Sequence, residues 1–189
     1  FENFSSFYHE TVFSMLASKK DEYTELNTFS TPYGRLLKSA LIFGPNGSGK
    51  TNWIKALSFM RDMVLASVID KSILKRNETF KFFDKSYLEP TLFEISFIQN
   101  DIVYEYGFKI LKDEIIEEWL NKKVQRTTAI FYRSTSDWNS IELHGDMKKA
   151  EKIKKFTRKD SLFLTTAAMF NIDIAEEIVN WFSDLYILV

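Results

Sequence analysis

The chain has 189 residues, of which 45% are hydrophobic and 27% are charged, and its formal net charge is −1. This length fits one domain or a large part of one, and 18 phenylalanines can supply a substantial core. The near-neutral charge gives no case for a protein that coats nucleic acid or lies on a membrane surface. Because the sequence lacks cysteine, disulfides, thiolate metal sites and cysteine nucleophiles are excluded.

No apolar run approaches the length of a membrane span, and the N-terminal residues include acidic side chains without a signal-like apolar block. We therefore expect a cytoplasmic protein without membrane association. The chain begins on Phe1 and ends on the apolar run 185–189, so both ends look cut from a longer polypeptide.

The first predicted elements surround a glycine-rich octet. An edge strand and a loop are predicted within 1–16, and a turn at 32–34 precedes the apolar run 39–43, which predicts a short strand. Residues 44–51 read Gly-Pro-Asn-Gly-Ser-Gly-Lys-Thr. A helix is predicted from about residue 50 because apolar residues then recur at helical spacing without Gly or Pro. These apolar residues are Ile54, Leu57, Val64 and Val68.

The octet fits the phosphate-loop pattern G-x-x-x-x-G-K-[ST]. Gly47 and Gly49 let the backbone form a nest whose N–H groups point at phosphate oxygens, and the helix adds the positive end of its dipole. Lys50 is expected to reach the β- and γ-phosphates and to act catalytically, and Thr51 is expected to be a ligand of Mg²⁺. The sequence therefore predicts a site for ATP and Mg²⁺. The predicted nucleotide-binding residues are Gly44, Pro45, Asn46, Gly47, Ser48, Gly49, Lys50, Thr51 and Asn52.

The second half of the chain is predicted to be first β-rich and then helical. After a connector at 77–90, the runs 92–98 and 102–110 alternate apolar side chains around Gln99-Asn100-Asp101, which predicts a β-hairpin. Further strands are predicted at 115–120, 129–133 and 141–144. From Asp146 onward the pattern becomes helical. The last helical segment places Ile174, Ile178, Trp181 and Leu185 on one face.

This order of elements favours one class of α/β fold. A strand, a phosphate loop, a helix and then several antiparallel strands differ from the βαβαβ alternation of kinase-like or small-GTPase folds. The order suits a P-loop NTPase with a head of the ATP-binding-cassette type, in which an antiparallel sheet lies beside the phosphate-loop core. We expect residues 1–145 to form its N-terminal lobe, with a β-rich subdomain at about 91–145. Residues 146–189 would begin a helical subdomain, and the C-terminal half of the head would lie outside the chain.

Several segments, in chain order, carry a resemblance to a known family. They are Asn3-Phe4-Ser5-Ser6-Phe7, Phe13-Ser14-Met15-Leu16-Ala17, Leu37-Lys38-Ser39, the loop at 44–51, Phe93-Glu94-Ile95-Ser96-Phe97, Tyr104-Glu105-Tyr106-Gly107-Phe108, Glu118-Trp119-Leu120 and Ser161-Leu162-Phe163-Leu164. With these segments the chain resembles the N-terminal part of the AAA15 family. These are bacterial cassette-type ATPases, related in their heads to chromosome-maintenance and double-strand-break repair ATPases and to overcoming-lysogenization-defect proteins.

The resemblance implies partners and a biological setting. Members are linked to defence against phage, some alongside a nuclease of the TOPRIM type, and their heads form homodimers or higher homo-oligomers. Two departures stand out. Such heads commonly carry Lys or Arg where this chain has Ser5. The sequence also shows neither a signature loop nor a strand ending in Asp-Glu, so residues 1–189 alone are not expected to turn nucleotide over.

Other polar residues offer weaker candidates for a role in the site. The stretch 65–70 superficially resembles a strand ending in Asp, but a continuation of the helix is favoured. Asp173, with Glu176 and Glu177, is interpreted as a helix start. Gln99 and Gln125 are favoured as turn or surface glutamines over a water- or Mg²⁺-contacting role. His9 and His144 are too isolated for a metal site or a base.

A basic cluster lies at 148–159. A solvated helix face is favoured for it over a nucleic-acid surface, because acidic residues are interleaved. Its members are Lys148, Lys149, Lys152, Lys154, Lys155, Arg158 and Lys159.

The phosphate loop and the resemblance are compatible with three functions. The first is an ATPase lobe that switches an assembly. The second is a nucleotide-gated scaffold or sensor with little turnover. The third is a DNA-repair or recombination head, for which salt-dependent DNA binding through the basic cluster would be diagnostic.

Overall fold

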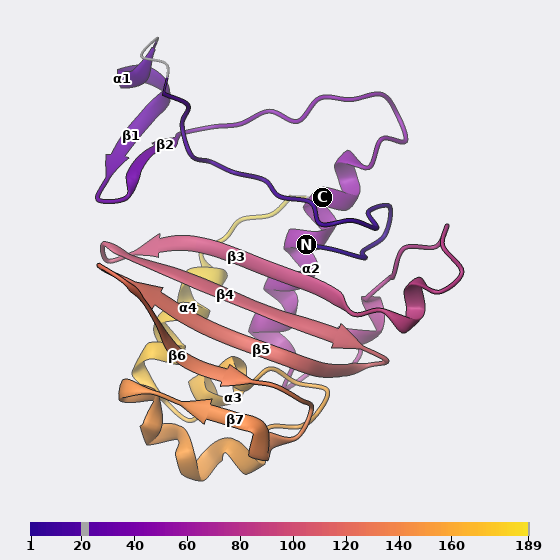
Figure 1. The fold of residues 1–189 in the computed structure, drawn as a ribbon, viewed down its shortest axis with the longest axis vertical. Coiled ribbons are helices and arrows are strands. Elements are labelled where there is room, and N and C mark those ends of the chain that lie inside the picture. The colour runs from indigo at the N-terminus through magenta and orange to yellow at the C-terminus, as the bar shows by residue number, and fades with distance from the viewer. Residues whose placement is uncertain (20–22, 189) are drawn as a thin grey trace.

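The centre of the computed structural model, which describes residues 1–19 and 23–188, is a five-stranded antiparallel sheet. Its strands neighbour one another in chain order (Figure 1). They are β3 (Thr91–Gln99), β4 (Ile102–Leu111), β5 (Glu114–Lys123), β6 (Thr127–Arg133) and β7 (Ile141–Leu143). The strands predicted between residues 92 and 144 are therefore confirmed. A second sheet, which the sequence did not predict, pairs β1 (Thr28–Thr31) with β2 (Gly34–Leu37), and α1 (Thr24–Asn27) precedes it.

The predicted hairpin is confirmed as β3 and β4. Phe93 pairs with Phe108 and Phe97 pairs with Tyr104 across the two strands, and all four side chains are buried. The turn at Asn100-Asp101 has φ angles of 50° and 58°, as a two-residue type I′ turn requires. Alternation thus places the aromatic side chains on one face of the sheet, which must be covered.

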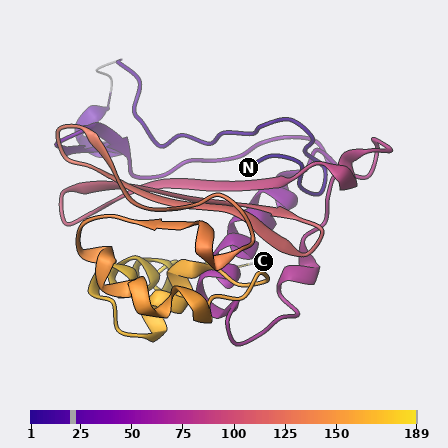
Figure 2. The same ribbon diagram turned by 60° about the horizontal axis from the view of Figure 1, so that its bottom comes forward.

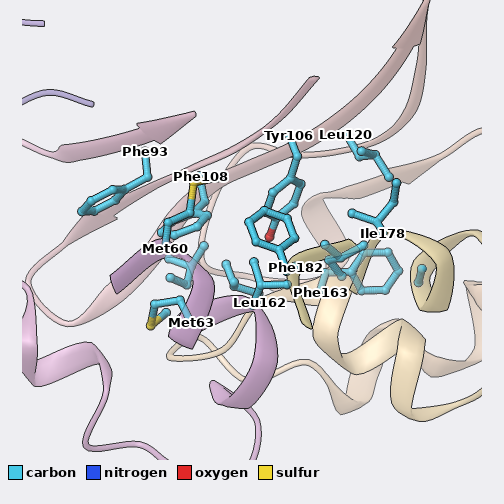
Figure 3. Close-up of a cluster of buried hydrophobic side chains, with 14 of the residues drawn as sticks. Met60, Met63, Phe93, Tyr106, Phe108, Leu120, Leu162, Phe163, Ile178 and Phe182 are labelled. Atoms are coloured by element: carbon cyan, nitrogen blue, oxygen red, sulfur yellow. The ribbon is translucent and has the colours of Figure 1, made fainter. Parts of the chain in front are cut away.

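Helices cover this face (Figure 1 and, from another side, Figure 2). They are α2 (Lys50–Ala66), the 3₁₀ helix Gly145–Phe156, α3 (Phe163–Met169) and α4 (Asp173–Ser183). Figure 3 shows side chains of α2, α3 and α4 meeting Phe93, Tyr106 and Phe108 of the sheet. Buried residues on both sides of position 145 belong to one hydrophobic cluster. Burying each large apolar side chain contributes roughly 1.5–3 kcal/mol, so this cluster holds the sheet and the helices together.

The buried faces of two helices differ from the predicted ones. In α2 the buried residues are Ala56, Phe59, Met60, Met63 and Val64, so only Val64 of the predicted set is fully buried. The helix carries apolar residues on more than one side, and periodicity could not decide which side meets the sheet. In α4, Ala175, Ile178 and Phe182 are buried, and Leu185 lies beyond the helix end. Residues 145–156 are helical as predicted, but the helix is 3₁₀ rather than α.

The prediction of an edge strand within 1–16 is wrong, because the structure has only isolated bridges there. Glu2 pairs with Leu92 beside β3, and Leu16 pairs with Leu36 beside β2. Asn3 and Ser5 have φ angles of 50° and 54°, which turn the chain back and let Phe4 pair with Phe7. Extended pairing cannot continue through two such residues.

The predicted connector at 77–90 contains a short 3₁₀ turn, Ser86–Leu88, which follows another at Leu74–Arg76. A third, Trp138–Ser140, precedes β7. After α4, residues 184–188 form neither helix nor strand, and Val189 lies outside the described residues. None of the helices in the described part of the chain has the length and apolarity of a membrane-spanning helix.

Candidate functional site

The glycine-rich octet forms a loop that leads into α2. Gly47 and Gly49 have φ angles of 82° and 92°, in the left-handed region that glycine enters without strain. A hollow of about 310 Å³ lies over the start of the helix and is lined by Asn46, Gly47, Ser48, Gly49, Lys50, Thr51 and Asn52. The structure therefore brings seven of the nine predicted nucleotide-binding residues to one depression.

Backbone donors converge at this depression. The first hydrogen bond of α2 runs from the Trp53 N–H to the Gly49 carbonyl at 3.1 Å, so the N–H groups of 50–52 precede it. Such N–H groups have no partner within the helix and carry the positive end of its dipole. The first turn contains no acidic side chain. This geometry suits a multiply charged anion such as a phosphate chain.

Lys50 lies across the loop. Its Nζ donates to the Gly44 carbonyl at 2.7 Å and to the Pro45 carbonyl at 2.8 Å, from the first residue of α2. Both bonds are exposed, so the ammonium group can exchange them for phosphate oxygens without losing a buried partner. Thr51, the next residue, is exposed to solvent, and its hydroxyl is of the type that binds Mg²⁺ in phosphate loops.

The N-terminal segment supports the loop from behind. A Cβ atom at Gly49 would lie 2.8 Å from Ser6 Oγ and 3.0 Å from Phe7 Cζ, so any other residue there would have to displace these side chains as well as adopt a positive φ. The Asn52 amide donates to Ser6 Oγ at 3.0 Å, which ties the first turn of α2 to this segment. The side chain of Asn52 is therefore engaged with Ser6. The sequence did not predict this support, although the pattern Asn-Phe-Ser-Ser-Phe had marked the segment.

The strand predicted just before the loop is absent. Residues 39–45 have no regular secondary structure, and Leu41 and Phe43 are 79% and 85% exposed. A strand exists only where a neighbour satisfies its N–H and C=O groups, and neither sheet of the described residues includes this segment.

The P-loop helix ends at a buried polar cluster. Ser67, just after α2, accepts a hydrogen bond from the Leu162 N–H at 3.2 Å, and the Thr165 hydroxyl donates to the Val64 carbonyl at 2.7 Å. The Arg158 guanidinium donates to the carbonyls of Ser67 and Val68. The C-terminal end of α2 is therefore fixed to the segment that begins α3.

A carboxylate from the sheet completes this cluster. Glu118 of β5 is fully buried and accepts hydrogen bonds from the N–H groups of Phe163 at 2.7 Å and Leu164 at 3.0 Å, and from the Tyr106 hydroxyl at 3.1 Å. Arg133, also fully buried, lies 3.8 Å from it. Burial raises the pKa of Glu118, and the charge of Arg133 and the two N–H donors oppose that rise. Burial also raises the pKa of Tyr106 well above its usual value, and the neighbouring Glu118 adds to the rise.

The weaker candidates have ordinary structural roles. Helix α2 ends at Ala66, so residues 67–70 do not continue it, and Asp70 accepts a hydrogen bond from the Ser72 N–H. Asp173 begins α4, as predicted. Gln99 ends β3, and Gln125 is exposed between β5 and β6. Among the described residues no group of three His, Cys, Asp or Glu side chains could hold a metal ion.

Ion pairs engage part of the basic cluster. Lys149 pairs with Asp173, Lys154 with Glu151, and Arg158 with Asp160. Lys159 pairs with Glu114. Within the described part of the chain, no ion pair involves the remaining members, Lys148, Lys152 and Lys155.

A glycine-rich loop that opens a long helix with Lys-Thr defines a P-loop nucleotide-binding domain. Residues 39–164 match the protein family described as AAA domain, putative AbiEii toxin, Type IV TA system. The match spans more than half of the chain, so the chain belongs to this family of P-loop ATPase domains. No curated protein and no solved structure matches the chain. An α/β fold with antiparallel sheets and helices is compatible with this membership.

Proposed function

We propose that the chain is the nucleotide-binding lobe of a cassette-type ATPase that binds MgATP at 44–51 and uses hydrolysis to switch an assembly. The observation that carries the proposal is the convergence of free helix N–H groups, the Lys50 ammonium and the Thr51 hydroxyl on one exposed hollow. Family membership supports nucleotide binding and hydrolysis as the class of activity.

The residues present fit a magnesium–nucleotide complex. The loop N–H groups and Lys50 would hold the phosphate oxygens, and Thr51 would supply one oxygen ligand to the metal. When bound, MgATP supplies the γ-phosphoryl group that is transferred to water. Lys50 would neutralise negative charge on the phosphate oxygens, since its ammonium stands at the mouth of the loop.

The assembly and its partners belong to the same proposal. The resemblance to AAA15 proteins supports heads that pair as a homodimer or higher oligomer, and a defence role with a TOPRIM-type nuclease as the controlled partner. A nucleotide-gated scaffold would use the same loop but would turn ATP over slowly. The two functions differ in steady-state turnover relative to ATP affinity.

The test compares full-length wild-type protein with the Lys50→Ala variant. We expect wild type to bind MgATP by isothermal titration and to release phosphate, and the variant to lose both with an unchanged circular dichroism spectrum. Lys55→Ala is the matched control, because Lys55 is an exposed lysine of the same helix and does not line the hollow. Equal ATP affinity and turnover in the wild-type and Lys50→Ala proteins would refute the site.

A further inference from the structure

A row of lysines lies on the 3₁₀ helix Gly145–Phe156. A 3₁₀ helix has three residues per turn, so side chains three apart stand above one another. Met147 and Ala150 are fully buried and Ile153 is half-buried, so this row faces the core. Lys149, Lys152 and Lys155 form the neighbouring row and are exposed. With a rise of about 2 Å per residue, their positions repeat about every 6 Å.

The row ends at an exposed pair of stacked rings. Phe156 and Phe170 have ring centroids 5.3 Å apart and an interplanar angle of 20°, and their side chains are 53% and 46% exposed. The Nζ atom of Lys155 stands 5.4 Å from the centre of the Phe156 ring. The aromatic side chains of β3 and β4 are buried against the helices, whereas this exposed pair adjoins a cation.

Nearby acidic side chains leave the ammonium groups of this row largely accessible to a ligand. Asp173 is 3.5 Å from Lys149, but both side chains are mostly exposed, and such a pair contributes little in water. Glu151 lies on the third row of the helix and pairs with Lys154. Lys152 and Lys155 have no ion pair within the described part of the chain.

We propose that Lys149, Lys152 and Lys155, together with the Phe156–Phe170 ring pair, bind single-stranded nucleic acid. Evenly repeated cations match the repeated phosphates of a strand. An unpaired base can stack on the exposed ring pair when the Lys155 ammonium, which lies over Phe156, moves to a phosphate. A duplex keeps its bases stacked on one another and cannot use the rings. A membrane is disfavoured as the ligand, because the apolar row of the helix is buried in the core and cannot insert.

The proposal predicts two separate effects on binding. Neutralising three phosphates gives a slope of about −2 in log affinity against log salt, which is about a twenty-fold loss between about 50 and 200 mM salt. Replacing one lysine by glutamine should reduce the slope by about 0.7. Phe156→Ala should weaken binding about ten-fold at every salt concentration without changing the slope.

The experiment measures fluorescence anisotropy of labelled oligo(dT) and oligo(U) with the full-length protein, without nucleotide, so the result does not depend on the P-loop. The variants are Lys152→Gln, Lys155→Gln and Phe156→Ala. The matched controls are Lys112→Gln and Phe82→Ala, because both residues are exposed and lie elsewhere, in the β4–β5 turn and the connector. The controls should bind like wild type.

Several outcomes would overturn the proposal. One is wild type that fails to bind oligo(dT) and oligo(U) at about 50 mM salt. Others are an unchanged slope in both lysine variants, or losses in the two controls that equal those in the test variants. Equal affinity for a duplex, or tighter binding to phosphatidylserine vesicles than to either oligonucleotide, would show a purely electrostatic surface instead. Unchanged melting temperatures are required for each variant to count.

Discussion

Replacing Glu118 by glutamine tests whether the buried carboxylate holds the sheet to α3. The substitution keeps the shape of the side chain but removes its charge and turns one acceptor into a donor. Three donors now point at this carboxylate, two from the backbone of α3 and one from Tyr106. At least one of them would meet an N–H₂ group and lose its partner, and Arg133 would lose the carboxylate that lies 3.8 Å from it.

The expected cost follows from burial. Breaking a buried ion pair by removing one partner destabilises by about 3–5 kcal/mol. The guanidinium of Arg133 keeps its bonds to the carbonyls of Thr135, Ser136, Ser161 and Arg158, so we expect about 3 kcal/mol, the low end. For a chain of this size that corresponds to a fall of about 6–12 °C in melting temperature.

Urea denaturation followed by circular dichroism, on full-length protein, measures the change in the free energy of unfolding. Glu117→Gln is the matched control, because Glu117 is the preceding residue of the same strand, is only partly buried, and bonds to the partly exposed Lys109 and to Tyr132. Its loss should cost under about 1 kcal/mol. A Glu118→Gln variant within about 1 kcal/mol of wild type would refute the reasoning, as would a control variant that is equally destabilised.

Three further predictions concern the loop and pH. Thr51→Ala should weaken the Mg²⁺ dependence of ATP binding, and superimposable metal titrations of variant and wild type would count against Thr51 as a ligand. Gly49→Ala should destabilise by about 1–3 kcal/mol, more than Gly47→Ala, because both have positive φ but only Gly49 lacks space for a Cβ; urea midpoints in the reverse order would contradict this. Burial acts to raise the pKa of Glu117, but the bonds from Lys109 and Tyr132 and the charge of Lys109 together lower it, so Glu117 loses its proton more readily in the folded protein than in the unfolded chain. That contribution to stability is present above about pH 4.5 and is lost as the pH falls through the lowered pKa of Glu117 in the folded protein. Urea denaturation at several pH values should therefore show a smaller loss of unfolding free energy toward acid in Glu117→Gln than in wild type.

The sequence was most informative where chemistry depends on a short local pattern. The phosphate loop needs glycines at fixed places, a lysine and a hydroxyl, and all of these are adjacent in the chain. The loop, the helix after it and the hairpin at 92–110 could therefore be predicted. The strand before the loop could not, because a strand depends on neighbours that an apolar run does not specify. The support of Gly49 by Ser6 joins residues more than 40 positions apart, and no local pattern encodes such a contact.

The polar cluster shows a second limit of sequence reasoning. Glu118 is one of three glutamates on β5, and nothing in the sequence around it distinguishes it from Glu114 and Glu117, which are only partly buried. Its burial becomes visible only when α3 brings two N–H groups to it. The segments around Glu118 and Ser161 had both been marked by the resemblance to AAA15 proteins. In the structure these two segments bond to each other.

The two ends of α2 therefore differ in a way that bears on the proposed switch. At the N-terminal end the N–H groups line the exposed hollow with Lys50. Asn52 bonds to Ser6, and the Trp53 ring packs against Phe1 and Phe13, so the first turn is held by contacts with the N-terminal segment. At the C-terminal end Ser67 is buried and bonded to the start of α3, which Glu118 in turn fixes to the sheet. The helix spans about 25 Å between these ends, from its 17 residues. A packed helix moves as one body. If a bound nucleotide shifts the N-terminal end of α2, the polar cluster at the C-terminal end must either move with the helix or resist the shift. The Glu118→Gln variant weakens this cluster and leaves the loop unchanged, so it separates the two cases. If the cluster resists the shift, the variant should bind MgATP more tightly than wild type although it is less stable.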